Sequence, residues 1–136
     1  MMNACENIFG NVMYGYSRAQ AIEEGVLIDV SPTAQTSGFK LPVAVTRSVW
    51  HTYIEWTNDD SEQQTSQNQS GRLADVLWML YSACKRNGDE SSIQYQLNVI
   101  PRDGQSIKPQ LISLKAVIDD GDNGEAVITI MLPTED

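Results

Sequence analysis

Residues 71–88 read GRLADVLWMLYSACKRNG, and this stretch decides how the chain folds. Asp75 lies in its first turn and Lys85 and Arg86 in its last turn, where each charge complements the helix dipole. Gly88 can adopt the left-handed conformation that ends many helices. The apolar residues recur at spacings of three and four, which places them on one helix face; they are Leu73, Val76, Leu77, Leu80, Ala83 and Cys84. We therefore predict a helix over residues 72–87, against which the other elements pack.

The chain after this helix changes to a period of two, which is typical of strands with one face on a core and the other in water. Apolar residues alternate with polar ones in three segments, so we predict strands over 93–100, 111–119 and 125–132. The last two flank Asn123-Gly124, a dipeptide that favours the tight turn of a β-hairpin. An antiparallel sheet of three or more strands follows from this pattern.

The chain before residue 71 contains three helix starts. Ser17 and Gln20 have the spacing of a capping box, which predicts a helix over 17–24. Ser31 followed by Pro32 begins a second, brief helix that ends near Gly38. Thr46 can cap a third helix over 47–56, with a buried stripe that we assign as follows: Val49, Trp50, Tyr53 and Ile54.

Two segments between these helices are expected to be extended. Residues 26–31 are rich in β-branched and aliphatic side chains, and residues 39–45 contain Pro42, which restricts that segment to a sheet edge or an irregular stretch. Either segment can extend the sheet. Helices first and strands afterwards indicate an α+β fold, which we predict to be a two-layer domain with the helices packed on one face of the sheet.

The 136 residues are enough for one domain with a core of its own. We expect a flexible N-terminal arm over residues 1–15, where the apolar residues follow no sustained period. Residues 57–70 contain no aliphatic or aromatic side chain, so we expect a flexible polar loop within the domain.

The composition excludes several classes of function. Eighteen acidic and nine basic residues give a formal charge of -9, which disfavours binding to nucleic acid or to an anionic membrane. Simple solubility is our preferred interpretation of this charge, with a basic protein partner as the alternative. No run is long and apolar enough to span a membrane, and we see no export signal. Cys5 and Cys84 are too far apart in the sequence to indicate a disulfide framework or a metal site, so we expect no cofactor and a cytoplasmic setting. The oligomeric state stays open.

Catalytic or metal-binding residues are poorly supported. His51 is the only histidine, so it cannot form a usual zinc site alone, and we expect it at the surface, paired with Glu55. The tip over residues 119–125 carries four carboxylates, but it lacks the spacing of a calcium-binding loop. A solvated acidic turn is our preferred interpretation, with weak ion binding or a basic protein partner as the alternatives.

Three arginines follow directly on predicted helix starts, where a cation opposes the helix dipole. They are Arg18, Arg47 and Arg72. One explanation is pairing with carboxylates such as Asp29, Glu55 or Asp75. The other is convergence on a shared anionic partner. We take these three arginines, with Trp50 and His51, as the candidate binding residues.

Four blocks of the chain together resemble an uncharacterised family of small bacterial proteins that are described as plasmid-related and are encoded on mobile elements. The blocks are YSRAQAIEEGVLIDVS (16–31), FKLPVAVTRSVW (39–50), GRLADVLWMLYSA (71–83) and GEAVITIMLP (124–133). The resemblance implies no catalytic residues. We therefore predict a non-enzymatic, protein-binding or accessory protein of a mobile element. The alternatives are an acidic DNA mimic that counters host defence, and a small enzyme using His51 with carboxylates.

Overall fold

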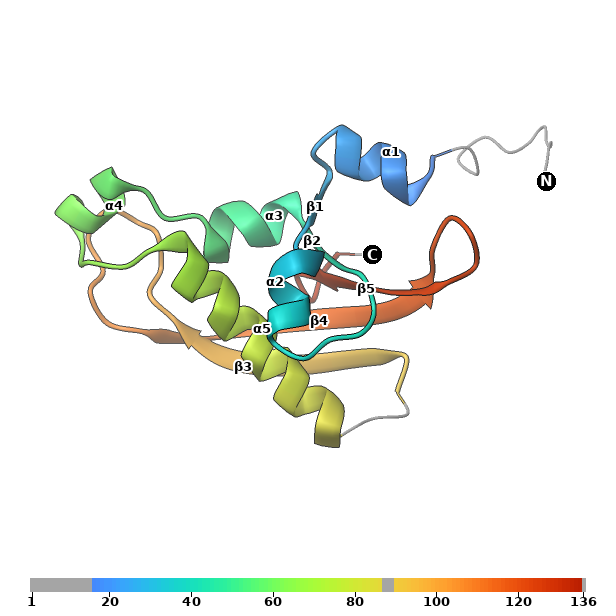
Figure 1. Cartoon of the computed structure of the whole chain (residues 1–136). Coiled ribbons are helices and arrows are strands. Elements are labelled where there is room, and N and C mark those ends of the chain that lie inside the picture. The colour runs from blue at the N-terminus through green and yellow to red at the C-terminus, as the bar shows by residue number, and fades with distance from the viewer. Residues whose placement is uncertain (1–15, 87–89, 136) are drawn as a thin grey trace.

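The computed structural model describes residues 16–86 and 90–135, which form a mixed five-stranded sheet with helices packed against it (Figure 1). The strand order is β1-β2-β5-β4-β3. The strands are β1 (Leu27–Asp29), β2 (Val43–Thr46), β3 (Ser92–Val99), β4 (Gln110–Asp120) and β5 (Ala126–Met131). The helices are α1 (Arg18–Glu23), α2 (Ser31–Thr36), α3 (Arg47–Val49), the π-helix η2 (Trp50–Ile54), α4 (Asn58–Gln63) and α5 (Gln69–Arg86). The α+β class is thus confirmed.

The sheet is mixed, and the prediction of a purely antiparallel sheet is wrong. Strands β3, β4 and β5 pair antiparallel in chain order, at the predicted positions. Both extended segments before the central helix also join the sheet, but β2 runs parallel to β5, with Val43 opposite Ile128. A parallel pair joins residues far apart in the chain, so no local pattern signals it.

Strand β2 lies inside the sheet, between β1 and β5, and the prediction of an edge or irregular segment is wrong for it. Pro42 precedes the strand, so its missing N–H removes nothing from the ladder, while its carbonyl accepts a hydrogen bond from the backbone N–H of Ile128 at 2.9 Å. Val43, Ala44 and Val45 are all fully buried, as expected of a strand with both faces covered.

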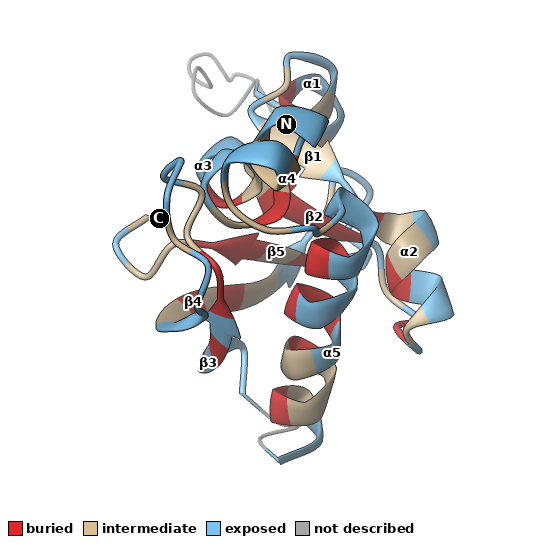
Figure 2. Cartoon of the chain, turned by 90° about the vertical axis from the view of Figure 1, so that its left-hand side faces the viewer, coloured by how far each residue is buried: buried red, intermediate tan, exposed pale blue. Residues whose placement is uncertain are grey.

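Helix α5 covers one face of the sheet and holds the centre of the core (Figure 2). Its buried apolar residues are Leu73, Val76, Leu77, Leu80 and Ala83, as the spacing predicts. Cys84 is half-buried, and burial raises the pKa of its thiol. The helix begins at Gln69, so Arg72 lies inside its first turn and not at its entrance. The predicted stop at Gly88 and the predicted arm over 1–15 lie outside the described residues.

The helix starts follow the predicted caps in two cases out of three. The Ser17 hydroxyl accepts the Gln20 N–H, and the Thr46 hydroxyl accepts the Val49 N–H. Ser31 does not cap α2, whose cap position is Val30; its hydroxyl accepts the backbone N–H of Val43 and so ties α2 to β2. Helix α3 continues as η2, and Val49 at the end of α3 and Ile54 at the end of η2 are both buried, five residues apart as the wider turn allows.

The polar segment 57–70 contains α4 and the first residues of α5, where composition predicts a flexible loop. Helix α4 begins with a complete capping box between Thr57 and Asp60, and Asp60 also forms an ion pair with Arg102 at 2.6 Å. Hydrogen bonds thus replace the missing apolar contacts. Whether the segment is mobile stays a prediction.

The opposite face of the sheet is partly covered by α1. Side chains alternate between the faces of a strand. Leu114, Ala116 and Ile130 therefore point to the α5 side and join its core, whereas Val127 and Met131 point to the other face and are nonetheless buried. The prediction of helices on one face of the sheet therefore accounts for α5, but not for α1, which lies on the other face.

Candidate binding groove

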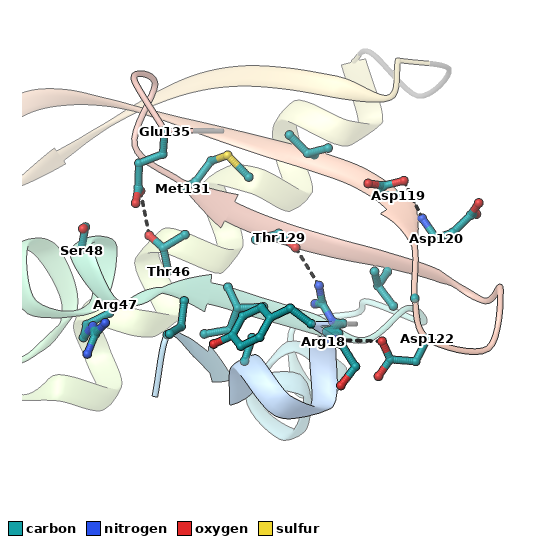
Figure 3. A pocket seen from close by; sticks show the side chains of 18 of the residues that line it. Arg18, Thr46, Arg47, Ser48, Asp119, Asp120, Asp122, Thr129, Met131 and Glu135 are labelled. Carbon is teal, nitrogen blue, oxygen red and sulfur yellow. Dashed lines mark hydrogen bonds between the residues drawn. The ribbon is translucent and has the colours of Figure 1, made fainter. Parts of the chain in front are cut away.

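An open groove of about 870 Å³ runs over the face of the sheet that carries α1 (Figure 3). Its floor comes from β4 and β5, one wall from α1 and β1, and its two ends from the β4–β5 turn and from the start of α3. The apolar lining residues are Ala21, Val26, Leu27, Val117, Val127 and Met131, and the charged ones are Arg18, Arg47, Lys115, Asp119, Asp120, Asp122 and Glu135. The groove thus combines an apolar floor with charges of both signs.

Arg18 holds α1 against the sheet and forms part of the groove wall. Its guanidinium donates one hydrogen bond to the Thr129 hydroxyl at 2.7 Å and one to the backbone carbonyl of Ile128 at 2.9 Å. Burial lowers the pKa of Arg18, and the nearby carboxylates of Asp29 and Asp122 partly offset that effect. Arg18 therefore fixes the shape of the groove through strand β5.

The acidic turn forms one end of the groove and is tied to α1. The Asp122 carboxylate accepts the backbone N–H groups of Arg18 at 2.8 Å and of Ala19 at 3.0 Å (Figure 3). These two hydrogen bonds lower the pKa of Asp122. The turn spans residues 121–125, longer than a two-residue hairpin turn, with Gly124 in the left-handed region at a φ of 81°. Within residues 16–86 and 90–135, no group of three or more acidic, His or Cys side chains is placed to hold a metal ion.

The other end of the groove is closed by the last described residues of the chain. Lys115 donates to the backbone carbonyl of Glu135 at 2.6 Å, and the Glu135 carboxylate accepts hydrogen bonds from the Thr46 hydroxyl and from the Leu132 N–H, each at 2.8 Å. The exposed Arg47 guanidinium lies at this end and makes no hydrogen bond or ion pair with any described residue. Arg47 is thus available to a ligand.

Arg18 beside the acidic turn and Glu135 near Arg47 are held in hydrogen bonds within the chain, and the remaining acidic side chains and Arg47 lie at different ends of the groove. Asp119, Asp120 and Asp122 lie at the turn end, and Arg47 lies at the opposite end, next to Ser48 (Figure 3). The side chains at the turn end attract cationic groups, and Arg47 attracts an anionic one. A ligand that carries one charge of each sign is therefore favoured in one direction over the other.

Arg72 does not share this site and lies buried on the α5 side, with 5% of its surface exposed. Its guanidinium donates to the carbonyls of Ile54 at 3.1 Å and Ile100 at 2.9 Å and to the side chain of Gln67, and it stacks over the Trp56 ring. Its Nη2 atom has no hydrogen-bond partner among the residues that the structure describes, and burial lowers the pKa of the side chain to about 10. Arg72 joins the end of η2 to the end of β3.

The remaining candidate residues also lie outside the groove. Trp50 is half-buried against the core and lines a separate cavity of about 260 Å³. The exposed His51 ring contacts the Glu55 carboxylate at 2.6 Å, and Arg102 joins the same carboxylate at 3.2 Å. The five candidates thus divide: two arginines share the groove, and the other three residues do not.

Sequence reasoning missed Lys115, Thr129 and Glu135, which complete the groove. One signal was available. Residues 126–132 read AVITIML, an almost continuous apolar run, and such a run is typical of a strand that is covered on both faces. It indicates an element on the second face of the sheet, although not which element.

The fold and site describe a small α+β protein with an open, charge-separated groove on one face of a mixed sheet. The chain belongs to a family of unknown function, DUF6573, whose model matches residues 2–136. No curated protein and no solved structure matches the chain significantly. No helix within the described residues is long and apolar enough to cross a bilayer.

Proposed function

We propose that this chain is a non-enzymatic binding protein that holds an extended segment of a partner protein in the groove. The observation that carries the proposal is the separation of the unpaired Arg47 guanidinium from the acidic turn across an apolar floor. A segment with an acidic residue near Arg47, apolar side chains on Val117 and Val127, and a basic residue near Asp120 fits this arrangement. Arginine is also a frequent centre of binding energy in protein interfaces.

A binding role is favoured over catalysis because the described lining residues include neither a histidine nor a cysteine. His51, three residues after Ser48 in the same helical segment, bonds to the Glu55 carboxylate and not to the Ser48 hydroxyl, so it does not activate Ser48 as a base. His51 lies outside the groove, on an exposed surface, with Glu55 and Arg102 as its neighbours. The mixed charge of the groove also gives the DNA-mimic alternative no support there, since a mimic needs a surface of one sign. A role on a mobile element rests on the sequence resemblance alone and is part of the proposal.

The test uses a displayed library of random peptides of about twelve residues, selected on the purified protein, because extended peptides are the expected ligands. We expect enriched peptides with an acidic residue at one end and a basic residue at the other. Arg47→Ala should weaken their binding at least about tenfold, which corresponds to about 1.4 kcal/mol. Val117→Arg, which fills the floor, should abolish it.

Lys108→Ala is the matched control, because Lys108 is an exposed cation outside the groove. Its affinity for the selected peptides should equal that of the unmodified protein. Failure to enrich any peptide, or enriched peptides that bind the Arg47 and Val117 variants undiminished, would show that the groove is not the binding site.

A further inference from the structure

Strand β3 is the outermost strand of the sheet on the side away from β1 (Figure 1). It spans eight residues with the sequence SIQYQLNV, which contains no charged residue, proline or glycine. Natural edge strands usually carry such residues, because these prevent pairing with another strand. The opposite edge of the sheet, β1, has only three residues and includes Asp29. The two edges therefore differ in their capacity to pair.

The register shows which backbone groups of β3 face outward. Ile118 donates its backbone N–H to the carbonyl of Ser91 at 2.8 Å, and the ladder continues from this pair with Ser92 opposite Val117. In an antiparallel pair, residues that bond across the ladder alternate with residues whose N–H and C=O point the other way. The second set on β3 comprises Ser92, Gln94, Gln96 and Asn98.

These four residues present a free hydrogen-bonding edge. Outside the sheet ladder, no described residue donates to or accepts from their backbone groups. All four side chains are exposed and neutral. The alternate residues Ile93, Tyr95, Leu97 and Val99 are buried under α5, so the strand is held in an extended conformation by its own core. An incoming strand meets an edge that is already ordered.

We propose that β3 pairs antiparallel with β3 of a second copy of this chain, centred on Tyr95, and that this pairing forms a symmetric dimer. In this register Gln94 lies opposite Gln96 of the second copy, and Ser92 lies opposite Asn98. Every outward-facing residue of one strand then meets an outward-facing residue of the other. The interface is self-complementary, as a two-fold axis requires.

The charge distribution favours a second copy as the partner. Two chains with a net charge of -9 each repel one another, so they can meet only where the surface is locally neutral, and β3 is neutral along its whole length. Asp75 and Arg86 lie near the two ends of α5, about three turns apart and hence on one side of the helix. Asp75 lines a small cavity with Asn98 of β3, so this side lies next to the β3 edge. In the dimer the two α5 helices run antiparallel, which brings Asp75 toward Arg86 of the second copy.

The dimer closes on itself. Once the two β3 strands have paired, only the β1 edges remain, and these are short and differ in sequence from β3. Further addition of copies through the same surface is therefore prevented, and a filament is not expected. Because one strand pair makes a small interface, we expect a dissociation constant on the order of 10 µM.

The experiment is sedimentation velocity on the full chain between about 2 and 200 µM, a range that brackets the expected constant. We expect a shift from monomer to dimer, which added salt strengthens by screening the repulsion between the acidic chains. Gln96→Pro removes an outward N–H and fixes φ at about −65°, but it removes none of the N–H groups that bond to β4, and it should raise the dissociation constant at least tenfold. Gln96→Ala keeps the N–H and is the matched control.

Gln96→Lys is a second variant for the same edge, since it adds a charge without changing the backbone, and it should also prevent dimerisation. Circular dichroism establishes that each variant is folded. A chain that stays monomeric throughout the concentration range overturns the proposal, and so does a dimer that tolerates both Gln96→Pro and Gln96→Lys. A dimer that Gln96→Ala weakens as much as Gln96→Pro would show that side-chain packing, not strand pairing, forms the contact.

Discussion

Replacing the buried Arg72 by methionine should reveal how much the fold depends on one guanidinium. The variant leaves the carbonyls of Ile54 and Ile100 without their Arg72 donor. A buried acceptor without a partner costs about 1–3 kcal/mol, and the lost stacking over Trp56 adds up to about 2 kcal/mol. Removing a buried charge offsets part of this loss, because the charge no longer has to be desolvated. We expect a net loss of about 3–4 kcal/mol.

The assay is urea denaturation followed by circular dichroism, with thermal unfolding as a second measurement. A loss of this size should lower the Tm by about 10 °C or more for a domain of this length. The stability of Arg72→Lys should lie between that of the unmodified protein and that of Arg72→Met, because an ammonium group cannot reproduce the planar set of donors. Arg47→Met is the matched control and should change stability by less than about 0.5 kcal/mol, since Arg47 is exposed and bonds to no described side chain.

The outcome also decides between two explanations for Arg72. A loss below about 1 kcal/mol, or one equal to that of Arg47→Met, would refute the structural role described above and return Arg72 to the candidate binding residues. A large loss would show that its conflict with the helix dipole is offset by hydrogen bonds to backbone carbonyls. Those carbonyls and the Gln67 side chain are its hydrogen-bond partners, whereas Asp75, named from the sequence, attracts it without a hydrogen bond.

Two further predictions concern the turns that position the groove and α5. Gly38→Ala should lower the Tm more than Gly25→Ala in the same thermal assay. Both glycines have positive φ, so both substitutions are strained. A Cβ on Gly38 would also lie 3.0 Å from the Tyr81 ring, whereas a Cβ on Gly25 meets nothing within 4 Å. Equal losses would contradict the contact. Asp122→Ala should destabilise the chain by about 1 kcal/mol at pH 7, because the N-terminal N–H groups of α1 lose their acceptor. The folded-state pKa of Asp122 is below its ordinary value of 3.8, so this contribution is present above that value and is lost as the pH falls through the lower one. The control is Asp120→Ala, because no described residue donates a hydrogen bond to the Asp120 carboxylate. An effect of Asp122→Ala on stability that persists unchanged below pH 3.8 would contradict the role of the Asp122 carboxylate as the acceptor for α1.

The local elements of this fold could be predicted because short-range patterns specify them. The apolar stripe of residues 71–88 repeats at the helix period, and the alternation after residue 92 repeats at the strand period, so each element shows which face it buries. The Ser17 and Thr46 caps depend on contacts three residues apart. Ser31 failed as a cap because its hydroxyl is used by Val43, a partner that no local rule identifies.

The candidate site could be predicted only in part. The position of Arg18 and Arg47 at helix starts marked them as unusual, and both line the groove. Arg72 had the same local signal, yet it lies in the core on the other face of the sheet. Helix-dipole reasoning identifies a cation that needs a partner, but it contains no information on which side of the sheet the helix packs.

The sequence by itself determined the α+β class, the central helix, the three C-terminal strands and the acidic character of the chain. Only the tertiary structure decided that β2 inserts beside β5 in the parallel direction, and that α1 crosses to the second face to form the groove. The physical reason is the range of the interactions. Helix and strand periods arise between residues a few positions apart, whereas the contacts of Arg18 with Thr129 and of Thr46 with Glu135 join the two halves of the chain and form only when the whole sheet is assembled.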